Sequence, residues 1–202
     1  GRVAAVPTVL LGSSREICSV RLSPDNRWLL MKVRDSQEDI IVARSDGTGL
    51  RRLTHDDFKD RDPVWGPDSD HIYFFSDRSG RYEEWRIRRD GSELQQVTRT
   101  EAVSTSSPYP SPDGRLLVFN CASGIDRATG LVDLSGQLPQ SSVQYLPRFD
   151  ETHGFGANSW SHEGRKLAGS LTSETGLVAA VVVYSLDTKS YDKITDQGFP
   201  VD

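Results

Sequence analysis

The sequence has few of the residues that mark disulfide-bonded, metal-binding or membrane-spanning proteins. Only two of the 202 residues are cysteines, Cys18 and Cys121, and they fit neither a disulfide scaffold nor a CxxC metal or redox motif. The longest apolar run, residues 177–184, is far shorter than the roughly 20 residues that cross a bilayer, so we expect no membrane insertion. The net charge of −5 argues against generic binding of nucleic acid.

No segment has apolar residues at the spacing of three to four residues that is typical of an amphipathic helix. The apolar residues instead form short runs, some continuous, as at 72–75, and some alternating with polar residues, as at 82–88. Continuous runs are typical of strands buried on both faces, and alternating runs of strands with one wet face. With 36% hydrophobic residues the chain can bury a core, and the pattern predicts an all-β protein.

A repeat of roughly 45 residues organises these strands. Its clearest column is a tight turn of the Ser-Pro-Asp type, which begins at Ser23, Gly66, Ser111 and Ser161. A second column places Thr or Pro after two apolar positions, at Thr54, Thr98, Pro147 and Thr195. Asn26, Gly114 and Gly164 suit the left-handed position of such a turn, whereas Ser69 predicts a different turn in the second unit. Asp-Gly pairs at 46–47 and 90–91 predict hairpins between third and fourth strands.

Four-stranded antiparallel units at this period are typical of β-propellers. We expect blades at residues 15–57, 58–102, 103–150 and 151–197, a part-blade at 1–14 and the start of another at 198–202. The first strands should end at the four turns. Trp28, Trp65, Trp85 and Trp160 lie on or beside these strands, and we expect them to pack between blades.

The second unit resembles the TolB-type propeller repeat, a WD-like repeat of the Trp-Ser-Pro-Asp-Gly kind. The resemblance rests on the segments 62–68 (DPVWGPD), 72–80 (IYFFSDRSG), 89–91 (RDG) and 97–98 (VT). Unit three departs from the pattern between Cys121 and Gln140, and unit four has His162-Glu163 in place of Pro-Asp. TolB-like propellers form six-bladed rings. The resemblance therefore implies that this chain, with four blades and two part-blades, forms an open fragment of a six-bladed or larger ring.

No reaction centre is recognisable. The chain lacks a Gly-x-Ser-x-Gly elbow, and His162-Glu163 lacks the second histidine of a zinc-protease motif. His153 and His162 could meet in space, but we expect no metal site, no cofactor and no catalytic residue. The arginines at 51, 52, 86, 88 and 89 alternate among acids and predict a solvated outer face.

The loops opposite the short turns are the expected contact surface for a partner. They comprise the links between blades and those between second and third strands, which mix aromatic and charged residues as interface anchors do. We expect the following residues on this surface: Phe58, Lys59, Arg61, Arg78, Tyr82, Arg148 and Phe155. The flanks of an open arc would expose apolar strands, which predicts dimerisation or marginal stability.

The leading hypothesis is a non-catalytic TolB-like propeller that binds a protein or senses a ligand. The first alternative is the gating propeller of a prolyl-oligopeptidase-type peptidase whose catalytic domain lies elsewhere. The second is a propeller lyase or hydrolase acting on carbohydrate, with His153 or His162 in the site. The resemblance implies a periplasmic or other extracytoplasmic location, and a cytoplasmic one stays open.

Overall fold

In the part of the chain that the structure describes, sixteen strands form four separate four-stranded antiparallel sheets, and in each sheet neighbouring strands are consecutive in sequence. The computed structural model describes residues 16–34, 38–102, 104–123, 126–173 and 175–195, and none of them is helical. The part-blades expected at 1–14 and 198–202 lie outside the described residues. The all-β propeller prediction is thus confirmed.

The bounds of the strands are as follows. The first sheet contains β1 (Glu16–Leu22), β2 (Trp28–Arg34), β3 (Glu38–Arg44) and β4 (Arg51–Arg52). The second contains β5 (Asp60–Trp65), β6 (His71–Ser76), β7 (Glu83–Arg88) and β8 (Gln95–Gln96). The third contains β9 (Ser104–Pro110), β10 (Leu116–Ser123), β11 (Asp126–Asp133) and β12 (Gln144–Tyr145). The fourth contains β13 (His153–Trp160), β14 (Lys166–Ser173), β15 (Val178–Ser185) and β16 (Ser190–Lys193). Each first strand ends one residue before its turn, as predicted.

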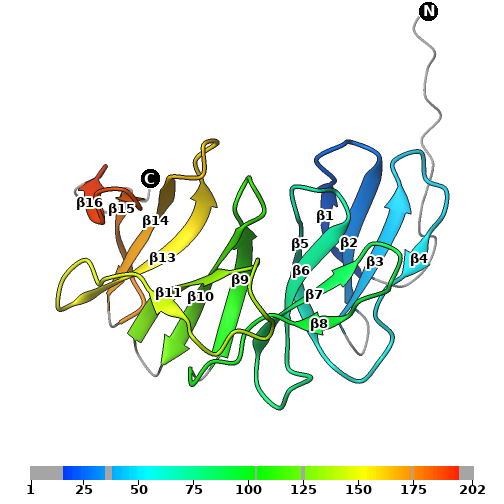
Figure 1. Cartoon of the computed structure of the whole chain (residues 1–202), viewed down its shortest axis with the longest axis horizontal. Coiled ribbons are helices and arrows are strands. Elements are labelled where there is room, and N and C mark those ends of the chain that lie inside the picture. Colours follow the sequence, from blue (N-terminus) through cyan, green and yellow to red (C-terminus); the bar gives the residue numbers. More distant parts are fainter. Residues whose placement is uncertain (1–15, 35–37, 103, 124–125, 174, 196–202) are drawn as a thin grey trace, which may run out of the picture.

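The sheets follow one another in an open arc, with the first and last sheets at opposite ends (Figure 1). Each first strand packs against the second and third strands of the preceding sheet: β5 on β2 and β3, β9 on β6 and β7, and β13 on β10 and β11. Apolar clusters fill these three joints. Three of the four tryptophans, Trp28, Trp65 and Trp85, belong to the cluster between the first two sheets, and Trp160 packs on the cluster between the last two. The prediction of packing between blades is confirmed.

All four turns share one backbone conformation. Asn26, Gly114 and Gly164 have φ values of 60°, 72° and 70°, and Ser69 has 58°. The prediction of a different turn at Ser69 is therefore wrong. A serine here adopts the left-handed region at a cost of order 1 kcal/mol, and its Oγ accepts the N–H of Asp25 at 3.0 Å. This hydrogen bond links the turns of the first two sheets.

A β-bulge interrupts every first strand, and in three of them it contains the residue three before the turn. In β5 and β9 that residue is a proline, Pro63 or Pro108, preceded by Asp62 or Ser107 with φ of 45° or 55°. A bulge leaves the extra residue outside the ladder, which is why proline is tolerated inside a sheet. In β1 the bulge lies earlier, at Cys18.

Candidate functional site

Four of the expected contact residues gather where two loops of the second sheet meet, and we call Phe58, Lys59, Arg61 and Tyr82 the link cluster. Arg61 donates through Nε to Glu38 Oε2 at 2.5 Å and its guanidinium carbon lies 5.2 Å from the centre of the Tyr82 ring. The backbone N–H of Lys59 donates to Asp77 at 2.9 Å. Phe58 keeps 39% of its surface exposed. The link cluster is accessible to a partner.

Arg78 lies beneath the link cluster and not on its surface. Its side chain is only 7% exposed, and its Nη2 donates to both oxygens of the fully buried Asp60 at 2.7 and 2.9 Å. Burial raises the pKa of Asp60, while hydrogen bonds from Arg78 and from neighbouring hydroxyls oppose that rise. The guanidinium also lies 5.4 Å from the ring of Phe58 and 5.2 Å from that of Trp85. Arg78 therefore holds the second sheet together.

The last two expected contact residues lie elsewhere. Arg148 is exposed in the link from β12 to β13 and donates to the Glu151 carbonyl at 3.1 Å. Phe155 is 2% exposed, and its ring lies 5.2 Å from that of Tyr191. Its placement on a contact surface is wrong, because β13 begins at His153 and turns Phe155 into the joint between the third and fourth sheets.

The ends of all four first strands line a central pocket of about 450 Å³. The residues that precede the turns, Leu22, Trp65, Pro110 and Trp160, contribute to its wall. The two indole N–H groups are satisfied, since Trp65 donates to the Arg21 carbonyl at 3.3 Å and Trp160 to the Tyr109 carbonyl at 2.8 Å. Sequence reasoning missed this pocket. The signal was present: the position before each turn is apolar in every unit, and these positions converge once the first strands lie side by side.

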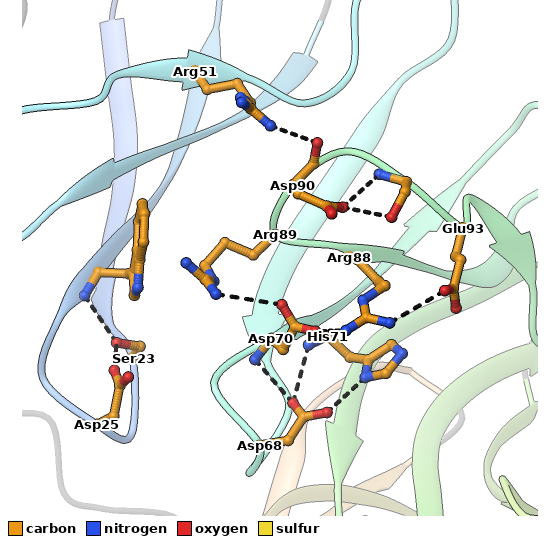
Figure 2. A network of polar contacts seen from close by, with 12 residues as sticks. Ser23, Asp25, Arg51, Asp68, Asp70, His71, Arg88, Arg89, Asp90 and Glu93 are labelled. Carbon is orange, nitrogen blue, oxygen red and sulfur yellow. Dashed lines mark hydrogen bonds and ion pairs between the residues drawn. The ribbon is translucent and has the colours of Figure 1, made fainter.

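A polar network joins the turns and hairpins of the first two sheets (Figure 2). The Asp70 carboxylate forms an ion pair with Arg88, and its Oδ1 lies 3.6 Å from Nη2 of Arg89. Asp68 accepts from His71 Nδ1 at 2.6 Å and from two backbone N–H groups. These hydrogen bonds lower the pKa of Asp68 against the opposing effect of partial burial.

Only part of the predicted outer arginine face is solvated. Arg51 is exposed and donates to the Asp90 carbonyl at 2.6 Å (Figure 2). Arg52, in contrast, pairs with Asp39, which is 1% exposed. Arg89 stacks on Trp28 with its guanidinium carbon 4.1 Å from the ring centre. Arg86 is half-buried and lines a groove toward the third sheet. For these three residues the prediction is wrong, because their side chains contact a buried carboxylate, a tryptophan of the first sheet or the groove toward the third sheet.

In the part of the chain that the structure describes, no three His, Cys, Asp or Glu residues lie close enough together to hold a metal ion. His153 instead contacts Asp150 through Nδ1 at 2.9 Å. None of the described segments is a helix with the length and hydropathy of a membrane span.

Residues 12–141 match the family model of the TolB beta propeller domain. The chain belongs to this family. An uncharacterized protein of Agrobacterium fabrum, Atu1656, is 32% identical over 158 residues, which cover 72% of this chain and 52% of that protein. The chain thus spans about half the length of this curated relative.

Several solved structures have the same fold. TolB from Acinetobacter baumannii has a TM-score of 0.66 at 20% identity, over 89% of this chain and 43% of that one. A puromycin hydrolase has a TM-score of 0.72 at 20% identity, over 93% and 30%. A chain of a nidogen/laminin complex has a TM-score of 0.63 at 15% identity, over 87% and 62%. At these identities the likeness establishes the fold alone.

Proposed function

We propose that this propeller is a non-catalytic module that binds another protein and receives a peptide segment of it in the central pocket. The observation that carries the proposal is the convergence of all four first strands on one hollow with a mainly apolar wall. Trp and Tyr supply large, rigid contact area and dominate the binding energy of many interfaces. Leu22, at the rim, is 49% exposed, so apolar surface is available to a ligand.

The relatives are compatible with this role. One structural neighbour is a chain of a nidogen/laminin complex, and others are TolB proteins. We propose the link cluster as a second contact area, since it combines exposed aromatic and cationic groups. We also propose an extracytoplasmic, periplasmic location, in line with the TolB family. Exposed apolar side chains on the end sheets, Val20 at 55% and Val178 at 53%, support dimerisation through these flanks.

The test uses peptides selected from a random library against the intact 202-residue protein. We expect Leu22→Asp to weaken the selected peptides by at least about tenfold, because it places a charge in the apolar wall. Leu177→Asp is the matched control: Leu177 is 71% exposed and belongs to the far sheet, so affinity should not change. Failure to select any peptide would overturn the binding role. Equal affinity of both variants would move the site away from the central pocket.

A gating propeller of a peptidase is the second candidate. It is favoured by the peptidase structures, among them a puromycin hydrolase with a TM-score of 0.72. Whether the full-length protein also contains a catalytic domain separates the two functions. A Gly-x-Ser-x-Gly elbow in a strand-turn-helix context would establish the peptidase, and further propeller repeats followed by a stop would favour the binding module.

A further inference from the structure

One cross-strand pair of the second sheet is polar, whereas the equivalent pair is apolar in the other three sheets. At the same position of the second and third strands, three sheets pair apolar residues: Leu30 with Val42, Val118 with Leu131, and Ala168 with Val183. In the second sheet this pair is Tyr73 and Arg86. The apolar pairs are built for burial, so a tyrosine and a guanidinium at this position serve no packing need that a leucine would not serve better.

Arg86 has only neutral partners in the described part of the chain. Its Nε and Nη2 donate to the side-chain oxygen of Gln95 at 3.1 and 2.8 Å, and the Tyr73 hydroxyl lies within its hydrogen-bonding reach. No described carboxylate lies within ion-pairing distance of it. A half-buried cation is costly unless an anion accompanies it. The position is therefore poised to accept one.

A second cation, Arg115 of the third sheet, lines the same pocket as Arg86. Arg115 follows the turn of the third sheet and is exposed, and no described carboxylate lies within ion-pairing distance of it, although its charge acts on the nearby Asp113 and Asp133. Both arginines line one pocket of about 480 Å³, together with Tyr73, His71 and Leu134. Two guanidinium groups, a phenol and an apolar floor thus open onto a single hollow.

The carboxylates on the rim of this pocket are already engaged in their own turns. Asp68 accepts hydrogen bonds from His71 and from two backbone N–H groups. Asp113 accepts the Ser111 hydroxyl at 2.6 Å and the backbone N–H of Arg115 at 3.0 Å. Both acids stabilise the geometry of their own turns, and neither lies within ion-pairing distance of Arg86 or Arg115, which both line the pocket.

We propose that this groove pocket binds a carboxylate group, held by Arg86 and Arg115. The planar fork of a guanidinium matches a carboxylate in a bidentate manner, and the Tyr73 hydroxyl adds a third polar contact. The carboxylate belongs either to a free dicarboxylate or to a Glu or Asp side chain of a bound polypeptide. The site is separate from the central pocket, so it does not depend on the proposed function.

The test is calorimetric titration of the 202-residue protein at low ionic strength with three probes: glutarate, acetyl-Gly-Gly-Glu-Gly-Gly-amide, and the same peptide with Gln in place of Glu. We expect saturable binding of at least one carboxylate probe and none of the Gln peptide. Binding of glutarate alone identifies a free dicarboxylate as the source. Binding of the Glu peptide identifies a polypeptide side chain. Absence of saturable binding, or equal binding of the Glu and Gln peptides, would overturn the proposal.

Two variants and one control locate the site. Arg86→Leu introduces the residue type that the third sheet has at this position, Leu131, opposite Tyr73, and so should preserve the melting temperature. Arg115→Gln removes the exposed cation. Each should weaken the carboxylate probe by about tenfold or more. Arg165→Gln changes the arginine that follows the turn of the fourth sheet and pairs with Asp187 at 3.3 Å, and should leave affinity unchanged. Unchanged affinity in both Arg86→Leu and Arg115→Gln would refute the assignment.

Discussion

Apolar clusters fill both the joint between the first two sheets and the joint between the last two, but the groups that surround these clusters differ in chemistry. Around the first joint, charges reach the interior: Arg78 pairs with the fully buried Asp60, and Arg61 crosses from β5 to Glu38 of the first sheet. The last joint is closed by rings. Phe155 lies between Tyr184 and Tyr191, with ring centres 6.5 and 5.2 Å away.

Both joints exclude water, yet they differ in what they require. A buried ion pair gains little net stability over apolar packing, but loss of one partner leaves a charge without compensation. A ring cluster loses only packing and transfer free energy when it is trimmed. Removal of one charged partner at the first joint should therefore cause a large loss in the free energy of unfolding that depends on pH. Trimming of a ring at the last joint should cause a smaller loss that does not depend on pH.

Arg78→Ala should have the largest effect. It leaves Asp60 buried and unpaired, and we expect it to lower the free energy of unfolding by about 3–5 kcal/mol at pH 7. Burial already raises the pKa of Asp60, and loss of the cation raises it further. The folded variant then retains a proton that the unfolded chain releases above about pH 4. The loss of stability should shrink as the pH falls toward 4, as urea denaturation at both pH values will measure.

The control for this prediction is Arg165→Ala, which breaks an exposed pair with Asp187. Its effect should stay within about 0.5 kcal/mol at either pH. The contrast between the two joints would collapse if Arg78→Ala were as mild as this control. The sequence alone predicted Arg78 as an exposed contact residue, whereas in the structure its side chain is buried and pairs with Asp60.

Phe155→Leu should have an intermediate effect. It trims one ring from the aromatic cluster while keeping an apolar side chain, so we expect a loss of about 1.5 kcal/mol in the free energy of unfolding. Because none of the rings around Phe155 titrates between pH 4 and 7, the loss should be equal at both values. A loss that grew with pH, as for Arg78→Ala, would show that the last joint also depends on charge.

The fold was predictable because local sequence signals within the repeats indicate where strands and turns lie. Turn residues, Asp-Gly pairs and apolar runs recur in phase, and their agreement fixes the strands and their order. The error at Ser69 arose because residue type alone was used, whereas a hydrogen bond to the neighbouring turn stabilises the left-handed serine. The site was less predictable, since the pairing of Arg78 with Asp60 joins residues whose contact depends on register.

Two further features could not be predicted from the sequence pattern alone. Phe155 was assigned to a loop because the start of β13 was placed too late, and a shift of this kind moves a side chain from surface to core. The Tyr73–Arg86 pair becomes conspicuous only when the registers of all four sheets are compared. The central pocket, in contrast, could have been found from the apolar position before each turn.

Phe58→Ala should affect stability less than Arg78→Ala or Phe155→Leu. The ring is 39% exposed and Arg78 lies 5.4 Å from its centre, an arrangement worth about 0.5–1 kcal/mol. Lys59→Ala, which removes a neighbouring exposed side chain, should cost less than this. If the link cluster contacts a partner, Phe58→Ala should weaken that binding by about 1 kcal/mol or more, measured by calorimetry once a partner is in hand. Normal binding by this variant would show that the Phe58 ring only shields the Arg78–Asp60 pair from solvent. The link cluster would then stabilise the first joint and have no role in binding.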